Sequence, residues 1–495
     1  MIEAFIEAIT WLFRPSMLII LVAATAVGLF VGVLPALGGM VGCALLLVIL
    51  PYMSPEIGLT ILLAFHSVTF TGGSITAILL NIPGTNVNAA TLIDGFPMSQ
   101  RGEGERAIGA SVTSSSLGGL VPVFLAFAMI PLIMPIVMLF KTPEMLGLII
   151  LGLSCLAFLT GDSVIKGCIS GCLGLLLAMI GFHGATGILR FTFGIDFLYD
   201  GFDLVALALG MFGVAELLDI SIKGHATVAP KYQKSGGLSN VMLGVKDVFN
   251  HKSLWLRSML IGYVAGIIPG VGAETATFIA YAQAKQTSRH PELFGTGVVE
   301  GVIAPEAANN AKEAGALLTT LAFGIPGSAI MAILLGAFMM VNVIPGPRML
   351  IDYLPLCFTM LLGIAFANVI GGVISLFAAP YLCRAASIHI DFLLPVVLIL
   401  AYTGVYVLRE SMFSIASVIF FALLGILMKR YGYSRPALLL GFVLGLLFEK
   451  YFWLSLKFWG PLFFMKPSFL IEMAIVLALF AYPYLRKVFS RSRKT

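Results

Sequence analysis

Five stretches of this 495-residue chain contain no Asp, Glu, Lys or Arg, and each exceeds the roughly 20 residues that a helix needs to cross a bilayer. They cover residues 17–55, 57–93, 107–140, 314–347 and 353–383. Shorter apolar stretches lie at 143–159, 164–182, 204–221, 254–269, 392–408, 413–428, 437–448 and 469–485. Only 11% of the residues are charged, against roughly 25% in soluble domains, which excludes a water-soluble fold. We therefore predict an all-α polytopic membrane protein with about 12 transmembrane helices.

Basic residues divide the chain and orient it. The polar segment 222–253 is lysine-rich and is predicted to be a cytoplasmic connection between two transmembrane repeat halves, residues 1–221 and 254–495, the second with additional C-terminal helices. The C-terminal tail carries five basic residues and no acid, so we expect the C-terminus, and with it the loop 429–435, on the cytoplasmic side. Residues 1–13 have one apolar side and are predicted to form a short interfacial helix.

The two halves carry the same Gly and Pro breaks in the same order. A Gly-x-x-Pro-x-x-Gly motif in each half predicts a broken helix, and a Gly followed eleven residues later by a Pro-Gly-Ser/Thr tip predicts a re-entrant hairpin. The broken-helix positions are Gly32, Pro35 and Gly38, matched by Gly266, Pro269 and Gly272; the hairpin positions are Gly72 and Pro83, matched by Gly315 and Pro326. This pattern predicts two repeat-related halves of inverted topology.

Such breaks have a use at membrane depth. Free N–H groups at a helix start attract an anion, while unwound carbonyls suit Na⁺. The predicted substrate-binding residues are Ser74, Asn81, Pro83, Gly84, Thr85, Asn86, Pro326, Gly327 and Ser328. The predicted coupling-ion or structural positions are the six broken-helix residues together with Glu274, Asn309 and Asn310. The competing interpretations are that the breaks only kink packed helices, that single Ser or Thr residues only join helices, and that Glu274 caps a helix start rather than binding a proton or cation.

Enzymatic chemistry has no recognisable motif in this chain. It contains no GxxxxGK[ST], HExxH or GxSxG sequence, so we expect no enzyme activity and no cofactor beyond Na⁺ or H⁺ as coupling ion. His66 and His183 lie in apolar surroundings without spaced partners, and the six cysteines lie in apolar segments, so no metal site is predicted. A net charge of +5 on 495 residues does not indicate nucleic-acid binding.

These motifs resemble the large permease subunit family of the tripartite tricarboxylate transporters. The resemblance rests on LPALGG (34–39), GGSITAILLNIPGT (72–85), DGFPM (94–98), GIIPGVGAETATFIAY (266–281), HPELFGTGVVEGVIAPEAANNA (290–311) and GIPGSAIMAILLGA (324–337). One position departs from the family pattern, because Ala36 stands where LPGLGG has its first glycine. Positive φ is costly for alanine, which weakens the case for a backbone contact to substrate there.

The resemblance implies a permease that takes up citrate-like tricarboxylates or related carboxylates across the bacterial inner membrane by symport with a cation. It also implies two protein partners, a small membrane subunit and a periplasmic carboxylate-binding protein. The tips at residues 83–85 and 326–328 would line the substrate site, with EAANNA (306–311) supporting it from a connecting loop.

Two other classes of function fit the sequence less well. A channel-like or structural membrane subunit without coupled transport predicts a continuous polar stripe along one helix, and the sequence displays none. An intramembrane enzyme needs paired acids or a His or Ser/Lys cluster at matching depth, and the apolar stretches lack these.

Overall fold

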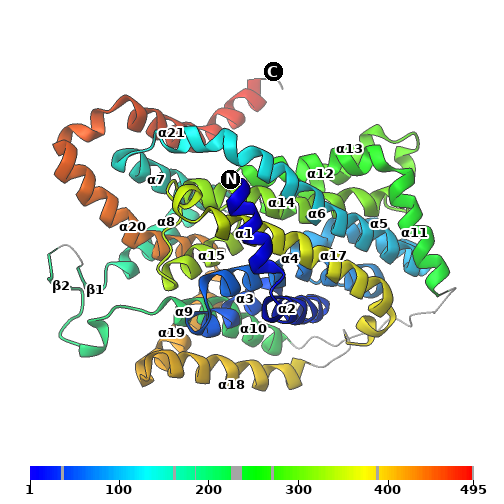
Figure 1. Cartoon of the computed structure of the whole chain (residues 1–495), viewed down its shortest axis with the longest axis horizontal. Helices are drawn as coiled ribbons and strands as arrows, with labels where there is room; N and C mark the ends of the chain where they lie inside the picture. Colours follow the sequence, from blue (N-terminus) through cyan, green and yellow to red (C-terminus); the bar gives the residue numbers. More distant parts are fainter. Residues whose placement is uncertain are drawn as a thin grey trace.

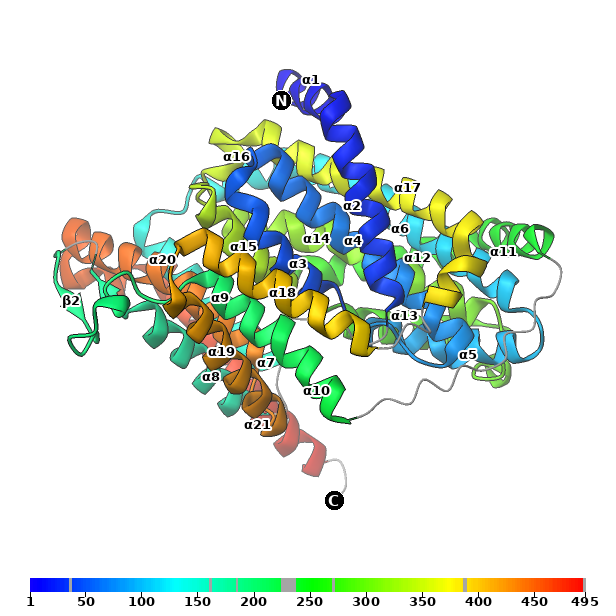
Figure 2. The same ribbon diagram turned by 90° about the horizontal axis from the view of Figure 1, so that it is seen from below.

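A computed structural model shows an almost entirely helical chain (Figures 1 and 2). It describes residues 1–34, 38–159, 163–183, 186–223, 237–268, 272–385 and 390–492. Helices α4 and α14 lie near the middle of the molecule in both views, and α5, α11, α12 and α13 gather at one end (Figures 1 and 2).

The first half supplies ten α-helices and the strands. The helices are α1 (Ile2–Leu12), α2 (Pro15–Val33), α3 (Gly38–Ile49), α4 (Pro55–Leu80), α5 (Ala89–Gln100), α6 (Gly104–Val137), α7 (Thr142–Leu159), α8 (Val164–Ala178), α9 (Leu204–Ala208) and α10 (Ala215–Lys223). A two-stranded antiparallel sheet, β1 (Gly181–Phe182) and β2 (Leu189–Arg190), pairs Gly181 with Arg190. A π-helix, η4 (Leu209–Val214), joins α9 to α10, and short 3₁₀ helices are η1 (Leu50–Tyr52), η2 (Asn86–Asn88) and η3 (Asp196–Leu198).

The remaining helices follow the segment 224–236, which lies outside the described residues. They are α11 (Leu238–Asn250), α12 (Lys252–Ile267), α13 (Gly272–Thr287), α14 (Glu300–Phe323), α15 (Ala329–Met340), α16 (Met349–Asp352), α17 (Leu354–Ala385), α18 (Ile390–Arg409), α19 (Met412–Arg430), α20 (Arg435–Trp459) and α21 (Pro467–Ser492), with 3₁₀ helices η5 (Pro291–Leu293) and η6 (Gly460–Met465). The predicted 222–253 connection thus includes helix α11.

Six helices in the described residues are long and apolar enough to cross a membrane. They span Pro15–Val33, Pro55–Leu80, Gly104–Val137, Leu354–Ala378, Met412–Arg430 and Arg435–Met465, and six shorter apolar helices accompany them. The prediction of a polytopic helical membrane protein is confirmed at this level. The count of about 12 spans stays a prediction, because the shorter helices are below the length of a full crossing.

Local sequence sets where the central helices begin and end. Pro55 is the first residue of α4. Its missing N–H costs no hydrogen bond there, because the first N–H groups of a helix have no partner within the helix. Asn81 ends α4 with a φ of 57°, and Gly324 ends α14 with a φ of 67°, both in the left-handed region that closes helices. Ser328 caps α15 by accepting the Met331 N–H at 3.4 Å.

The EAANNA segment does not lie on a connecting loop, so that expectation is wrong. Residues 306–311 lie within α14, and Glu306, Asn309 and Asn310 are fully buried. Alanine is the best helix former, and polar residues on an alanine-rich helix are compatible with burial when they find partners on a facing helix. Polar content alone therefore misled the interpretation.

Candidate functional site

Corresponding helices of the two halves make the same close backbone contacts. A Cβ on Gly32, near the end of α2, would lie 2.2 Å from the Thr69 carbonyl oxygen of α4. A Cβ on Gly266, near the end of α12, would lie 2.2 Å from the Lys312 carbonyl oxygen of α14. Only glycine allows helices to approach this closely, so α2 packs on α4 as α12 packs on α14.

The two Pro-Gly tips rest against these same glycines. A Cβ on Gly84 would lie 2.6 Å from the Gly32 carbonyl oxygen, and one on Gly327 would lie 2.8 Å from the Gly266 carbonyl oxygen. Each tip therefore sits on the last turn of the helix that precedes the break in its own half. The sequence motifs predicted a broken helix and a tip in the same order in each half, and the structure places the tip in contact with the helix before the break.

The breaks themselves are only partly described. Pro35 and Pro269 lie outside the described residues. Gly38 and Gly272 open α3 and α13 with φ angles of 62° and 74°, so both helices restart at a left-handed glycine. Glu274 is exposed in the first turn of α13.

The polar residues of the tips differ in exposure. Asn81 and Asn86 are exposed, Pro83 and Thr85 are half-buried, and Gly84 is buried. In the second tip, Pro326, Gly327 and Ser328 are all buried. The first tip thus presents polar groups at the surface of the chain, whereas the second tip is buried within it.

A fully buried carboxyl group on α14 joins the two halves. Glu306 accepts hydrogen bonds from Ser74 of α4 at 2.6 Å and from Ser115 of α6 at 2.6 Å. Thr91 of α5 also donates to it. Hydroxyl donors from three helices of the first half therefore surround one acid of the second, with no cation among these partners.

A hydrogen-bond chain connects this acid to the first tip. The Thr85 hydroxyl donates to Asn88 Oδ1 at 2.7 Å, and the Asn88 amide donates to Ser74 Oγ at 2.7 Å. Ser74 in turn donates to Glu306. Ser74, predicted as a substrate ligand, thus lies behind the tip and supports it through Asn88.

Further along the same interface, α14 carries two buried asparagines. The Asn310 amide donates to Asn368 Oδ1 of α17 at 2.5 Å and lies 3.4 Å from the Ser67 carbonyl oxygen of α4. Neither polar atom of the Asn309 amide has a hydrogen-bond partner among the described residues. A buried amide without a hydrogen-bond partner is uncommon in native proteins.

A cluster of ionisable side chains ends this interface. His66 Nε2 of α4 lies 3.3 Å from Glu313 Oε1, and Lys312 forms an ion pair with Glu313. The Lys312 ammonium also lies 5.2 Å from the centre of the Phe70 ring. All three ionisable side chains are at most 3% exposed. The sequence offers His66 no partner at a local spacing, and the structure supplies one from a distant helix.

The sequence hid this polar interface because it is divided between two distant helices. On α14 it uses Glu306, Asn310 and Glu313, at positions that share one helix face, and on α4 it uses Ser74 and His66. The polar residues of each helix share one face, but their partners lie on a helix more than 200 residues away in the sequence. One feature of the sequence pointed to this interface: Glu306, Lys312 and Glu313 occur in an alanine-rich stretch next to a long uncharged run.

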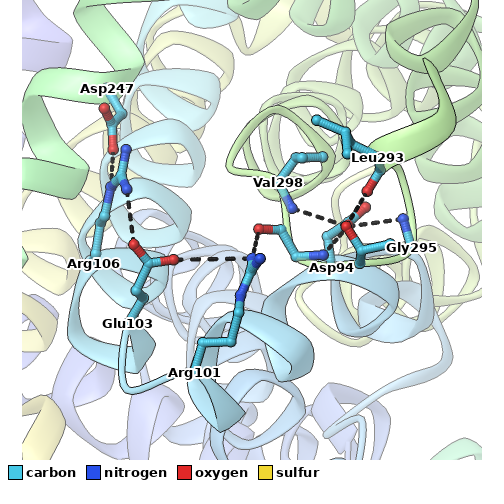
Figure 3. A network of polar contacts seen from close by, with 10 residues as sticks. Asp94, Arg101, Glu103, Arg106, Asp247, Leu293, Gly295 and Val298 are labelled. Carbon is cyan, nitrogen blue, oxygen red and sulfur yellow. Dashed lines mark hydrogen bonds and ion pairs between the residues drawn. The ribbon is translucent and has the colours of Figure 1, made fainter. Parts of the chain in front are cut away.

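A second polar network lies near the end formed by α5, α11 and α13 (Figure 3). The buried Asp94 carboxylate of α5 accepts backbone N–H groups from Gly295 at 2.9 Å, Gly297 at 2.8 Å and Val298 at 3.1 Å. The Tyr281 hydroxyl of α13 donates to its other oxygen at 2.8 Å. Asp94 thereby fixes the loop that leads into α14.

Basic residues flank this network and tie α6 to α11. Arg106 Nε donates to Asp247 at 2.6 Å and its Nη1 to Glu103 at 3.1 Å, while Arg101 donates to the Gly297 carbonyl oxygen (Figure 3). Among the residues that the structure describes, no group of three or more His, Cys, Asp or Glu side chains is arranged to hold a metal ion. The charge-assisted hydrogen bonds of this network join α5, α6 and α11 to the loop before α14, and we refer to it as the clamp.

We expect Asp94→Ala to lower the free energy of unfolding by about 2 kcal/mol, because three backbone N–H groups and one hydroxyl lose their acceptor. Thermal unfolding of the purified chain in detergent measures this. Glu103→Ala is the control, since a half-exposed ion pair contributes about 0–1 kcal/mol. Equal melting of wild type and Asp94→Ala would show that the clamp does not stabilise the fold.

Comparison with known proteins places this arrangement in a family. The model of the tripartite tricarboxylate transporter TctA family matches residues 18–440. An Agrobacterium vitis relative, an uncharacterized 52.8 kDa protein in the TAR-I ttuC' 3'region, is 33% identical over 425 residues, which cover 86% of this chain and 84% of that protein. A second A. vitis relative, an uncharacterized protein in the TAR-II ttuC' 3'region, is 32% identical over 190 residues, which cover 38% of this chain and 78% of that protein.

Proposed function

The chain belongs to the tripartite tricarboxylate transporter TctA family, and from that membership we propose that it is the membrane permease subunit of a binding-protein-dependent secondary transporter. Its substrates are citrate-like tricarboxylates or related carboxylates, and a Na⁺ or proton gradient drives their uptake. A small membrane subunit and a periplasmic carboxylate-binding protein complete the transporter in the bacterial inner membrane.

The observation that carries this proposal is the matched pair of tips and broken helices. Gly84 packs on the Gly32 carbonyl oxygen as Gly327 packs on the Gly266 carbonyl oxygen, with Cβ approaches of 2.6 and 2.8 Å. Interrupted helices in corresponding places of two halves are the strongest sequence indication of a transporter's central site. We assign substrate binding to the tips and ion coupling to the breaks, because each tip contacts the helix that precedes the break in its own half.

The contacts between α4 and α14 support an inverted relation of the halves. Ser74 contacts Glu306, and His66 contacts Glu313, so residue numbers rise along one helix as they fall along the other. The two helices are therefore antiparallel, and they occupy corresponding places, each following a broken helix and preceding a tip. If corresponding helices both cross the membrane in opposite directions, the halves have inverted topology.

The proposed orientation is compatible with an ion-pair cluster at the end of α10. Lys429 lies 2.6 Å from both Glu216 and Asp219, so the loop 429–435 and the start of the 222–253 connection lie on the same side of the molecule. Both segments are rich in basic residues, the composition of cytoplasmic loops. We propose that the C-terminus shares this cytoplasmic side.

Uptake of labelled citrate and other carboxylates into proteoliposomes tests the function. With the small subunit and the binding protein present, we expect uptake that requires an imposed Na⁺ or proton gradient. Asn81→Ala and Ser328→Ala should each reduce it about tenfold, the effect of losing one positioned hydrogen bond to a charged ligand. Ser434→Ala, which removes a helix cap far along the chain from both tips, is the matched control. Flux that ignores both gradients and the binding protein would favour a channel-like subunit instead.

A further inference from the structure

The crossing of α4 and α14 holds three ionisable side chains that the proposed substrate site does not use. His66, Lys312 and Glu313 are at most 3% exposed, and the Glu313 carboxylate faces both of the others. A buried lysine and glutamate neutralise each other, but the imidazole adds a third group that can take up a proton. His66 Nδ1 has no hydrogen-bond partner among the described residues.

This cluster contacts the interrupted helices of both halves. A Cβ on Gly39, in the first turn of α3, would lie 2.6 Å from His66 Nδ1, so the imidazole lies against the helix that restarts after the first break. The Lys312 backbone carbonyl lies against Gly266, in the last turn of α12 before the second break. The residues of the cluster therefore contact both elements that the proposed function assigns to ion coupling, His66 through its side chain and Lys312 through its backbone.

The charge balance gives proton binding a consequence. With the Lys312–Glu313 pair ionised and His66 neutral, the cluster carries no net charge, the arrangement that burial favours. One added proton, on His66 Nε2 or on Glu313 Oε1 across their 3.3 Å contact, gives the cluster a charge of plus one. A buried positive charge stabilises a bound carboxylate, and by linkage the carboxylate stabilises the bound proton.

We propose that His66, Lys312 and Glu313 form the proton-binding site of this transporter, so that one proton enters this cluster with each anionic substrate. The proposal rests on the proposed function and names its coupling ion. The proton binds reversibly to a lone pair of His66 Nε2 or Glu313 and leaves from the same atom, so no covalent bond between heavy atoms changes.

Few other titratable groups face the cluster from the helices packed around it. The Cys43 thiol of α3 interacts electrostatically with the Glu313 carboxylate. The Tyr263 backbone of α12 contacts Gly315 of α14. Glu306 lies two turns away on α14 and is already surrounded by hydroxyl donors. Helices α2 and α15 contribute no charged side chain. The Lys312–Glu313 pair thus sets the electrostatic environment of His66.

Two variants test the proposal without leaving a buried charge unpaired. His66→Gln removes the imidazole, and the double variant Lys312→Met/Glu313→Gln removes the ion pair together, which avoids the large penalty of removing one partner. In proteoliposomes with both partner subunits, we expect citrate uptake under an inward proton gradient to fall about tenfold, equivalent to one unit of pKa in proton affinity. Citrate exchange without a gradient should persist.

His251→Gln is the matched histidine control. A hydrogen bond to Glu300 raises the pKa of the His251 imidazole, which lies half-buried between α11 and α12, away from the cluster. We expect this variant to keep the full response to the proton gradient. Loss of the response in all three variants would indicate a general effect of histidine or charge removal and would overturn the assignment.

Infrared difference titration of the purified chain gives a readout that does not need transport. Wild type should show carboxyl and imidazole bands that change between acidic and neutral pH, and the Lys312→Met/Glu313→Gln and His66→Gln variants should each lose one component. An unchanged titration in both variants, or uptake that follows Na⁺ alone at every pH, would overturn the proton site. Absence of any carboxylate uptake by wild type would instead contradict the proposed function, while the titration would still decide the proton site.

Discussion

Glu306→Leu is expected to lower the free energy of unfolding by about 3 kcal/mol, because three buried hydroxyl groups lose a shared acceptor at once. The substitution also disconnects Ser74 from the second half and so loosens the Thr85–Asn88–Ser74 chain that holds the first tip. Thermal unfolding in detergent measures the stability, and citrate uptake measures the effect on the tip.

The control for Glu306 replaces donor and acceptor together. In the triple variant Thr91→Val/Ser115→Ala/Glu306→Leu, two of the three orphaned hydroxyls disappear, and we expect more than half of the lost stability to return, because removing both partners of a buried hydrogen bond is close to neutral. If the triple variant were less stable than Glu306→Leu alone, the hydroxyl groups would be stabilising the fold by packing and not through the carboxyl group.

Hydropathy predicted the helices of this chain well because lipid imposes one rule on them, that every backbone polar group must be paired within the segment. The uncharged run 57–93 contains most of α4 and the first turn of α5, and the run 107–140 contains most of α6. Gly and Pro placed the helix ends near 34–37 and 268–271, between α2 and α3 and between α12 and α13. These signals are local, so one sequence is enough to read them.

The polar interface needed information that one sequence does not carry. The contacts of Ser74 with Glu306 and of His66 with Glu313 join residues more than 200 positions apart, and neither partner is unusual within its own helix. The tip residues Asn81, Thr85 and Ser328 were identifiable because Pro-Gly neighbours mark them. Glu306 and Glu313 could not be identified in this way. Acidic and amide residues are typical of loops, but they also occur on a buried helix when a polar partner faces them.

Gly32→Ile and Gly266→Ile should each lower the free energy of unfolding by about 3 kcal/mol or more, since a side chain at either position meets a backbone carbonyl at 2.2 Å that cannot rotate away. Gly171→Ala of α8 is the control: the nearest atom to its Cβ lies 3.8 Å away, and alanine favours the helix by up to about 1 kcal/mol. Thermal unfolding of the three variants gives the comparison.

The equality of the two effects is the informative part of that experiment. If α2 with α4 and α12 with α14 are corresponding units, the same substitution should have the same consequence in both halves, for stability and for citrate uptake alike. A large loss from Gly32→Ile with little from Gly266→Ile would mean that only one half depends on the close helix contact. The matched tips would then belong to two differently built sites, and a transport cycle that opens the site alternately through related halves would lose its main structural argument.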